Sequence, residues 1–311
     1  MKNIVGKIDS MQQAKDPSKT HRLATLLRAQ LGLSHLMQSK TIITAERAAL
    51  KLRSRPLEKT KTTAEKVVFL LPFVRRSHVS DWAKVTHNLN CTLNSFRAQT
   101  NPNWHAVICG QDAPNFKPDE RIQFIHFEKP IQGHDKWGKL SVLLDHFLEQ
   151  THSDSYIMTF DADDLAHRNL VSYYIEQQAP HGYVMDHGVI HDIARNQFGQ
   201  AGHRSLEFPL RKPFWKLCGS CVAFRCRPQE APHIIPFLKR LTQHEHRMFP
   251  YLANLANRPL QPVLENLIMY EFNHGENFDH RLNQGKFKER FVKRFQISDS
   301  SQLDEIHSGF L

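Results

Sequence analysis

The sequence predicts an α/β fold with a mostly parallel sheet, on three observations. From residue 67 onward, short apolar segments alternate with segments that have the periodicity of amphipathic helices. The apolar segments are continuous, which is typical of strands buried on both faces of a parallel sheet. One of them, Tyr156–Phe160, leads directly into the carboxylates Asp161, Asp163 and Asp164. The carboxyl ends of such strands are where α/β proteins bind ligands.

Residues 1–65 are expected to form a basic helical extension with a linker. Ser18 can cap a helix in which the leucines between Leu23 and Leu31 form one apolar stripe. A second helix is expected after Thr44, and the stretch 56–63 has the composition of a linker. The leucine stripe fits three roles: packing on the main domain, a dimer contact, or binding to a membrane surface.

Residues 66–280 are expected to form the main α/β domain, in which right-handed crossovers connect parallel strands. The predicted strands cover residues 67–71, 104–109, 122–127, 156–160, 182–186 and 218–224. The predicted helices cover residues 81–98, 137–148, 229–241 and 260–272. Residues 281–311 are expected to form a basic tail.

Positive charge is concentrated at the two ends of the chain. The chain has 311 residues and a net charge of +10, but residues 1–66 hold 14 Lys and Arg against 5 Asp and Glu. A second basic patch lies between Arg281 and Arg294. Such patches are solvated faces, or they bind anionic lipid or nucleic acid. Nucleic acid is not expected as a partner, because residues 1–66 contain no aromatic side chain for base stacking.

Targeting signals and cysteine usage favour a cytoplasmic protein. The sequence has no apolar run near the ~18 residues that span a bilayer, and its first residues lack the apolar core of a secretory signal. Five cysteines fit free thiols in a reducing compartment. Cys218 and Cys221 form a CxxC pair, for which small buried residues are expected over a metal or redox site. Residues 1–60 suit peripheral contact with an anionic inner membrane face.

The three carboxylates favour a metal site for a phosphate-bearing substrate. Carboxylates are costly to bury unless they are paired, and a hard divalent cation such as Mg²⁺ binds oxygen ligands and bridges to phosphates. Alternatively, the aspartates occupy a turn, with Asp164 capping a helix.

Four motifs in this order resemble the GT-A fold nucleotide-diphospho-sugar transferases, family 2 in particular. They are Phe69-Leu70-Leu71-Pro72, the helix end Thr92–Thr100, the segment Gly138-Lys139-Leu140-Ser141-Val142-Leu143, and Phe160-Asp161-Ala162-Asp163-Asp164. The resemblance is close over residues 67–170 and loose over residues 171–280. It departs from the family at Gly110-Gln111-Asp112-Ala113, where the family has Asp-Asp-Gly-Ser.

The resemblance implies an inverting hexosyltransferase that moves a sugar from a nucleotide-diphosphate donor to a hydroxyl acceptor. The acceptor would be a glycan or a lipid-linked glycan in cell-surface glycan synthesis. Mn²⁺ or Mg²⁺ would be the cofactor, held by Asp161 and Asp163 with His274 as a further ligand. The donor would contact Pro72, Asp112, Lys139 and Asp161. Glu245 is the first candidate for the general base, and Asp186 is the second.

Two other functional classes remain open. A haloacid-dehalogenase-type phosphatase would use Asp161 as nucleophile and Asp163 as acid, but that motif normally follows the first strand of its domain, and here three predicted strands precede it. A non-catalytic basic protein would bind nucleic acid or a membrane surface through the amino-terminal segment. A sugar nucleotidyltransferase is disfavoured, because the loop at residues 72–76 contains no glycine.

Overall fold

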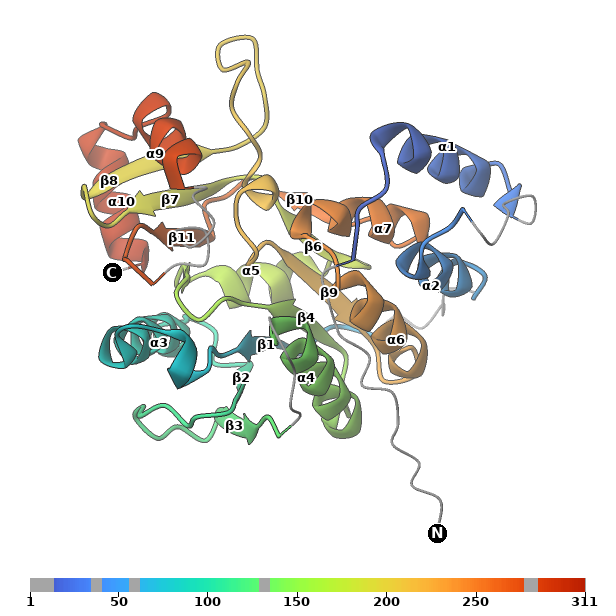
Figure 1. Ribbon diagram of the computed structural model, residues 1–311, viewed down its shortest axis with the longest axis horizontal. Helices are drawn as coiled ribbons and strands as arrows, with labels where there is room; N and C mark the ends of the chain where they lie inside the picture. Colours follow the sequence, from blue (N-terminus) through green and yellow to red (C-terminus); the bar gives the residue numbers. More distant parts are fainter. Residues whose placement is uncertain (1–13, 35–40, 56–61, 129–134, 277–284, 311) are drawn as a thin grey trace.

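A mostly parallel seven-stranded sheet forms the centre of the molecule (Figure 1). The computed structural model describes residues 14–34, 41–55, 62–128, 135–276 and 285–310. The strand order is β10-β6-β9-β4-β1-β2-β3, and β9 alone runs antiparallel to its neighbours. The strands are β1 (Lys66–Pro72), β2 (Trp104–Gly110), β3 (Ile122–His126), β4 (Ser155–Thr159), β6 (Gly182–Met185), β9 (Val222–Cys226) and β10 (Gln261–Val263). The predicted fold class, an α/β protein with a mostly parallel sheet, is confirmed.

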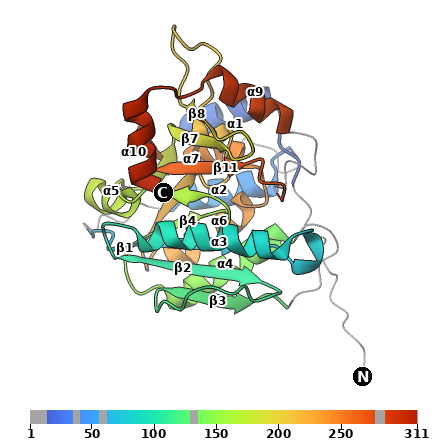
Figure 2. The same cartoon turned by 90° about the vertical axis from the view of Figure 1, so that its left-hand side faces the viewer.

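Helices pack on both faces of this sheet, as the alternation of side chains along β4 shows. Tyr156 packs against Tyr174 of α5 (Leu170–Gln177), with ring centroids 5.7 Å apart. Its neighbour Ile157 points to the opposite face, as the twofold period of a strand requires, and meets Leu144 of α4 (Lys136–Gln150). Figure 2 shows α3 (Trp82–Arg97) lying along β1 and β2.

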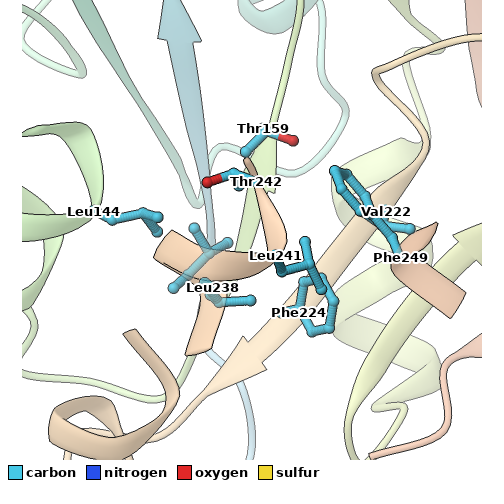
Figure 3. Close-up of a pocket in the computed structure, with 9 residues that line it drawn as sticks. Leu144, Thr159, Val222, Phe224, Leu238, Leu241, Thr242 and Phe249 are labelled. Atoms are coloured by element: carbon cyan, nitrogen blue, oxygen red, sulfur yellow. The ribbon is translucent and has the colours of Figure 1, made fainter. Parts of the chain in front are cut away.

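Aromatic and aliphatic contacts fill the two layers. On one face, the Phe69 ring of β1 stacks on Phe96 of α3 with centroids 4.0 Å apart, and Phe160 contacts both rings edge-on. On the other face, leucines of α4 and α6 (Ala231–Leu241) meet β4 and β9 (Figure 3). The apolar layers hold β4 rigidly, and Asp161 follows directly after this strand.

The predicted helix at residues 260–272 is wrong, because this segment forms two strands. β10 belongs to the central sheet, and β11 (Ile268–Phe272) belongs to a second sheet with the order β5-β11-β7-β8. Pro262 lies in β10, at an edge of the sheet, where a residue without an N–H is tolerated. The other strands of the second sheet are β5 (Leu165–Ala166), β7 (Gly188–Asp192) and β8 (Gln197–Ala201). The strand predicted at 218–224 begins later, at Val222.

The amino-terminal extension forms helices, as predicted. α2 (Thr44–Arg53) packs on α6 and α7 (Phe249–Leu255) and buries Ala45, Ala49 and Leu52. The buried Glu46 carboxylate fixes this arrangement, since it accepts hydrogen bonds from Tyr251 at 2.7 Å and from the Ile43 amide at 3.1 Å. The main part of the predicted linker, residues 56–61, lies outside the described residues.

The leucine stripe of α1 (Lys19–Gln30) packs on the main domain only through Leu26, which is partly buried against the core. The helix buries Thr25 and Ala29, whereas Leu23, Leu27 and Leu31 are 60%, 49% and 71% exposed. Of the three roles proposed for the stripe, packing on the domain therefore fails for these leucines.

The carboxy-terminal residues form helices that pack on the second sheet. α9 (Gly285–Arg294) contacts β7 and β8 and buries Phe291 and Val292, and α10 (Ser300–Phe310) buries Ile306 and Phe310. The segment expected to be a basic tail is thus part of the packed structure over residues 285–310. Arg281 lies outside the described residues.

Candidate functional site

A cavity of about 930 Å³ lies at the carboxyl ends of β1 and β4. It brings together six of the eight predicted site residues: Pro72, Lys139, Asp161, Asp163, Glu245 and His274. They come from the end of β1, from α4, and from the loops that follow β4, α6 and β11. The topology accounts for this convergence, because parallel neighbouring strands end at the same edge of the sheet.

The Ser220 hydroxyl shapes the aspartate loop that follows β4. Because β9 is antiparallel to β4, the segment that enters β9 lies beside the end of β4. Ser220 in this segment accepts a hydrogen bond from the Asp161 amide at 2.8 Å and donates one to Asp164 Oδ2 at 2.5 Å. Gly219 lies so close that a Cβ there would be 2.6 Å from Asp161 Oδ2. A larger residue at this position would displace the Asp161 carboxylate from its observed place.

Asp164 has a structural position, buried behind the loop. Its Oδ2 also accepts from the Cys218 thiol at 3.2 Å, and its Oδ1 has no hydrogen-bond partner among the described residues. Burial, followed by the neighbouring charges of Asp163 and Asp161, raises the pKa of Asp164 well above its ordinary value. Cys218 and Cys221 are free and buried, as expected for small core residues.

His274 meets Asp163 because of the pairing in the second sheet. β5 follows the aspartate loop and pairs antiparallel with β11, which directs Asp163 toward the residues after β11. His274 Nε2 lies 2.9 Å from Asp163 Oδ2, and its Nδ1 lies 3.2 Å from the Asn88 amide nitrogen. His274 is buried, so the ring is held in place by its surroundings.

Two lysines of α4 pair with acids in the cavity. Lys136 Nζ donates to Asp161 Oδ1 at 2.5 Å. Burial lowers the pKa of Lys136, but the ion pair with Asp161 and the charge of the nearby Asp163 outweigh this effect and raise the pKa overall. Lys139 is buried, pairs with Asp135 at 2.9 Å and donates to the Phe73 carbonyl at 2.6 Å. The prediction that Lys139 is a nucleotide contact stays open, but its charge is already balanced by Asp135.

Glu245 lies at the rim of the cavity, at the start of the 3₁₀ turn His246–Met248. Its side chain is 47% exposed. The next residue, His246, was not predicted and also lines the cavity. Burial, then the nearby cations Arg247, Lys288 and Lys136, lower the pKa of His246 to about 4. A neutral imidazole of this kind is a weak base but a good hydrogen-bond acceptor for a substrate.

Asp112 and Asp186 are absent from the described lining of the cavity. Asp112 follows β2 and accepts a hydrogen bond from the Arg76 amide at 2.9 Å. Asp186 follows β6, which is separated from β4 by β9. Two strand spacings separate Asp186 from the end of β4 by roughly 10 Å. Asp186 contacts His203 instead.

Sequence reasoning also missed a set of cations that line the cavity. These are Lys212, Lys216, Arg247, Lys286, Lys288 and Arg290, here called the cationic lining. Burial lowers the pKa of Lys216, and the charges of Arg204, Lys19, Lys212 and Arg247 lower it further. Part of the basic patch predicted at residues 281–294 therefore faces the cavity. Such mutual repulsion is relieved by a bound anion.

The donor atoms around Asp163 suit a divalent cation. Asp161 and Asp163 offer carboxylate oxygens to the cavity and His274 offers an imidazole nitrogen, which are donor types that Mn²⁺ and Mg²⁺ sites use. In the described structure the three are not gathered around one point, because the Asp161 carboxylate pairs with Lys136. The Asn88 amide and the Glu276 backbone N–H donate to His274 Nδ1 at 3.2 and 3.4 Å, so Nε2 carries the ring proton toward Asp163. Binding of an ion at Nε2 would require that proton to move.

Comparison with protein-family models and with curated protein sequences finds no match for this chain. Every helix among the described residues is too short or too polar to span a bilayer.

We predict that Asp164→Asn stabilises the protein increasingly as pH rises. Between the ordinary pKa of Asp and the raised folded value, the folded chain holds a proton that the unfolded chain has released, so stability falls with rising pH. Asparagine keeps an acceptor for Ser220 but does not ionise. The gain over wild type should grow by up to about 1.4 kcal/mol for each pH unit above the ordinary pKa of Asp, until Asp164 ionises in the folded chain. Denaturant unfolding in EDTA measures it, and an equal gain at every pH would contradict the assignment.

Proposed function

We propose that this chain is a GT-A-like glycosyltransferase that moves a sugar from a nucleotide-diphosphate donor to a hydroxyl acceptor. The observation that carries the proposal is a single cavity that is lined by Asp161, Asp163 and His274 and by the cationic lining. A nucleotide diphosphate needs both features, because its phosphates bind cations and its departure adds negative charge. The order of motifs around β1, α3, α4 and β4 supports the same conclusion.

In this proposal each group of cavity residues has its own role. Asp161, Asp163 and His274 hold Mn²⁺ or Mg²⁺, which when bound stabilises negative charge on the leaving diphosphate. Lys136 neutralises Asp161 before the donor arrives and lies within reach of its phosphates. Glu245, exposed at the rim, is the candidate base that removes the proton of the acceptor hydroxyl. A base acting from the acceptor side gives inversion at the sugar carbon.

A phosphatase of the haloacid-dehalogenase type fits less well. Its motif follows the first strand of the domain, whereas β4 follows three others.

The acceptor is proposed to be a glycan carried at an anionic membrane surface. α1 exposes Leu23, Leu27 and Leu31 on one stripe, with no partner shown for them in the described part of the chain. The start of α1 lies near the cavity, since the Lys19 charge contributes to lowering the pKa of Lys216. Exposed leucines beside basic residues suit binding at the surface of an anionic bilayer.

Calorimetric titration with UDP, GDP and dTDP, each with and without Mn²⁺, tests the donor site. We expect one nucleotide to bind in a metal-dependent way. Asp163→Ala should weaken that binding at least about tenfold, a loss of about 1.4 kcal/mol, and should remove its dependence on Mn²⁺. Asp145→Ala is the matched control, because this half-exposed carboxylate of α4 lies outside the described lining. If no nucleotide binds to the folded protein under either condition, the transferase proposal fails.

Vesicle co-sedimentation tests the membrane contact of α1. The full chain should bind vesicles that contain phosphatidylglycerol more tightly than neutral ones. Replacing Leu23, Leu27 and Leu31 by Ser should reduce this binding at least about tenfold, because most of the inserted apolar area is lost. Leu264→Ser is the control, since Leu264 is 57% exposed on another element. Undiminished binding by the triple variant would rule out α1 as the contact.

A further inference from the structure

A second group of ligating side chains lies away from the cavity, between β6 and the β7–β8 hairpin. Asp186 and His187 connect β6 to β7, and His203 follows β8. The hairpin register pairs Gly188 with Ala201, which brings the residues just outside this pair face to face. His203 therefore faces Asp186 and His187, although 16 or more residues separate them in the sequence.

Three donor atoms of these residues converge on one point. His187 Nε2 and His203 Nδ1 are 3.1 Å apart, His203 Nδ1 and Asp186 Oδ2 are 3.2 Å apart, and His187 Nε2 and Asp186 Oδ2 are 3.9 Å apart. Ligands of a tetrahedral zinc ion with bonds of about 2.0–2.1 Å are separated by about 3.3–3.4 Å. The three atoms thus form a triangle of nearly the size that one zinc ion requires.

The surroundings of His187 are those of a fixed metal ligand. The backbone of Leu264 hydrogen-bonds its ring, and a hydrogen bond from the backbone fixes ring orientation in many metal sites. Gly202 gives the ring its space, because a Cβ there would lie 2.7 Å from His187 Cδ2 and 2.9 Å from Nε2. These two features hold the nitrogen toward His203 and Asp186.

We propose that Asp186, His187 and His203 form a zinc-binding site distinct from the aspartate site of the cavity. Two imidazoles and one carboxylate are donors that zinc prefers, and three protein ligands leave the fourth position for water or another ligand. His203 is 58% exposed, so the ion enters from solvent on that side. The positive charge of Arg211 acts on His187. The Arg211 guanidinium carbon lies 3.8 Å from the centroid of the Phe208 ring, so the guanidinium also contacts that ring.

The ion would fasten the base of the loop at residues 202–213, which projects from the molecule (Figure 1). His203 is the second residue of this loop, whereas Asp186 and His187 belong to the sheet edge. The loop exposes the trypsin site Arg204 next to the exposed Leu206, and a second trypsin site, the half-buried Arg211, follows the exposed Leu210. Zinc binding should therefore slow cleavage in the loop.

Zinc titration of metal-free protein tests the site, in an Asp163→Ala background that removes the candidate cavity ligand. We expect this variant to bind one equivalent of zinc, and a further His203→Asn change to weaken that binding at least about 100-fold. His233→Asn is the matched control, because His233 is an exposed histidine on α6. Asp186→Asn, which keeps the side-chain shape, should also weaken binding.

Two further readouts need no enzymatic activity. Co²⁺ in place of zinc should give the intense visible absorption of a four-coordinate site, and His203→Asn should abolish it. Zinc should slow tryptic cleavage in the loop of the background variant but not in the His203→Asn variant. Equal zinc affinity in the His203→Asn and His233→Asn variants would overturn the proposal, as would the absence of a bound equivalent in the background variant.

Discussion

The hydroxyl of Ser220 is the interaction on which the candidate site depends most. It connects the backbone of Asp161 to the buried carboxylate of Asp164, and so fixes both ends of the aspartate loop. This contact exists because β9 runs antiparallel in an otherwise parallel sheet, which brings the amino end of β9 to the edge where β4 ends. The single reversed strand therefore supplies a hydroxyl and Gly219 at a place where parallel strands would supply only loops.

The charges in the cavity suit the binding of a phosphate-bearing molecule. The Asp161 carboxylate is paired with Lys136 and Asp163 contacts His274. Near η3 (Phe214–Lys216), burial and then the neighbouring cations Arg204 and Arg247 lower the pKa of Lys212 and Lys216. Buried charges of one sign are costly unless an opposite charge joins them. A diphosphate bound with a divalent cation satisfies both groups, because it presents negative oxygens to the lysines and a positive ion to the aspartates.

Much of the central sheet was predictable from local patterns, and the long-range contacts were not. β1, β2, β3 and β4 are apolar runs, and α3 and α4 have a clear helical period, so both signals lie within short segments. In the segment 260–272 the apolar residues fit both the 3.6-residue period of a helix and the two-residue period of a strand. Only the pairing of this segment with β6 and β7 decides that it forms strands. The exposure of the α1 leucines likewise depends on how that helix packs on α7.

The same division applies to the candidate site. Asp161 and Asp163 were predictable as neighbours because they directly follow a recognisable strand, whereas His274 was proposed only from the resemblance to the transferase family. The pairing of Lys139 with Asp135 was not predicted, because it depends on how the start of α4 packs, and the nucleotide contact of Lys139 stays a prediction. Asp186 was assigned to the cavity because the reversed strand β9, which separates it from β4, is not evident in the sequence.

Product analysis with nucleotide-sugars tests the central claim most directly. The protein is incubated with a panel of nucleotide-sugars and Mg²⁺ in the absence of an acceptor, so that water takes the sugar slowly, and the products are separated by anion-exchange chromatography. The account predicts free sugar and nucleoside diphosphate from one donor, and none from the Asp163→Ala variant. Release of inorganic phosphate from phosphate esters, with no nucleoside diphosphate from any donor, would contradict it.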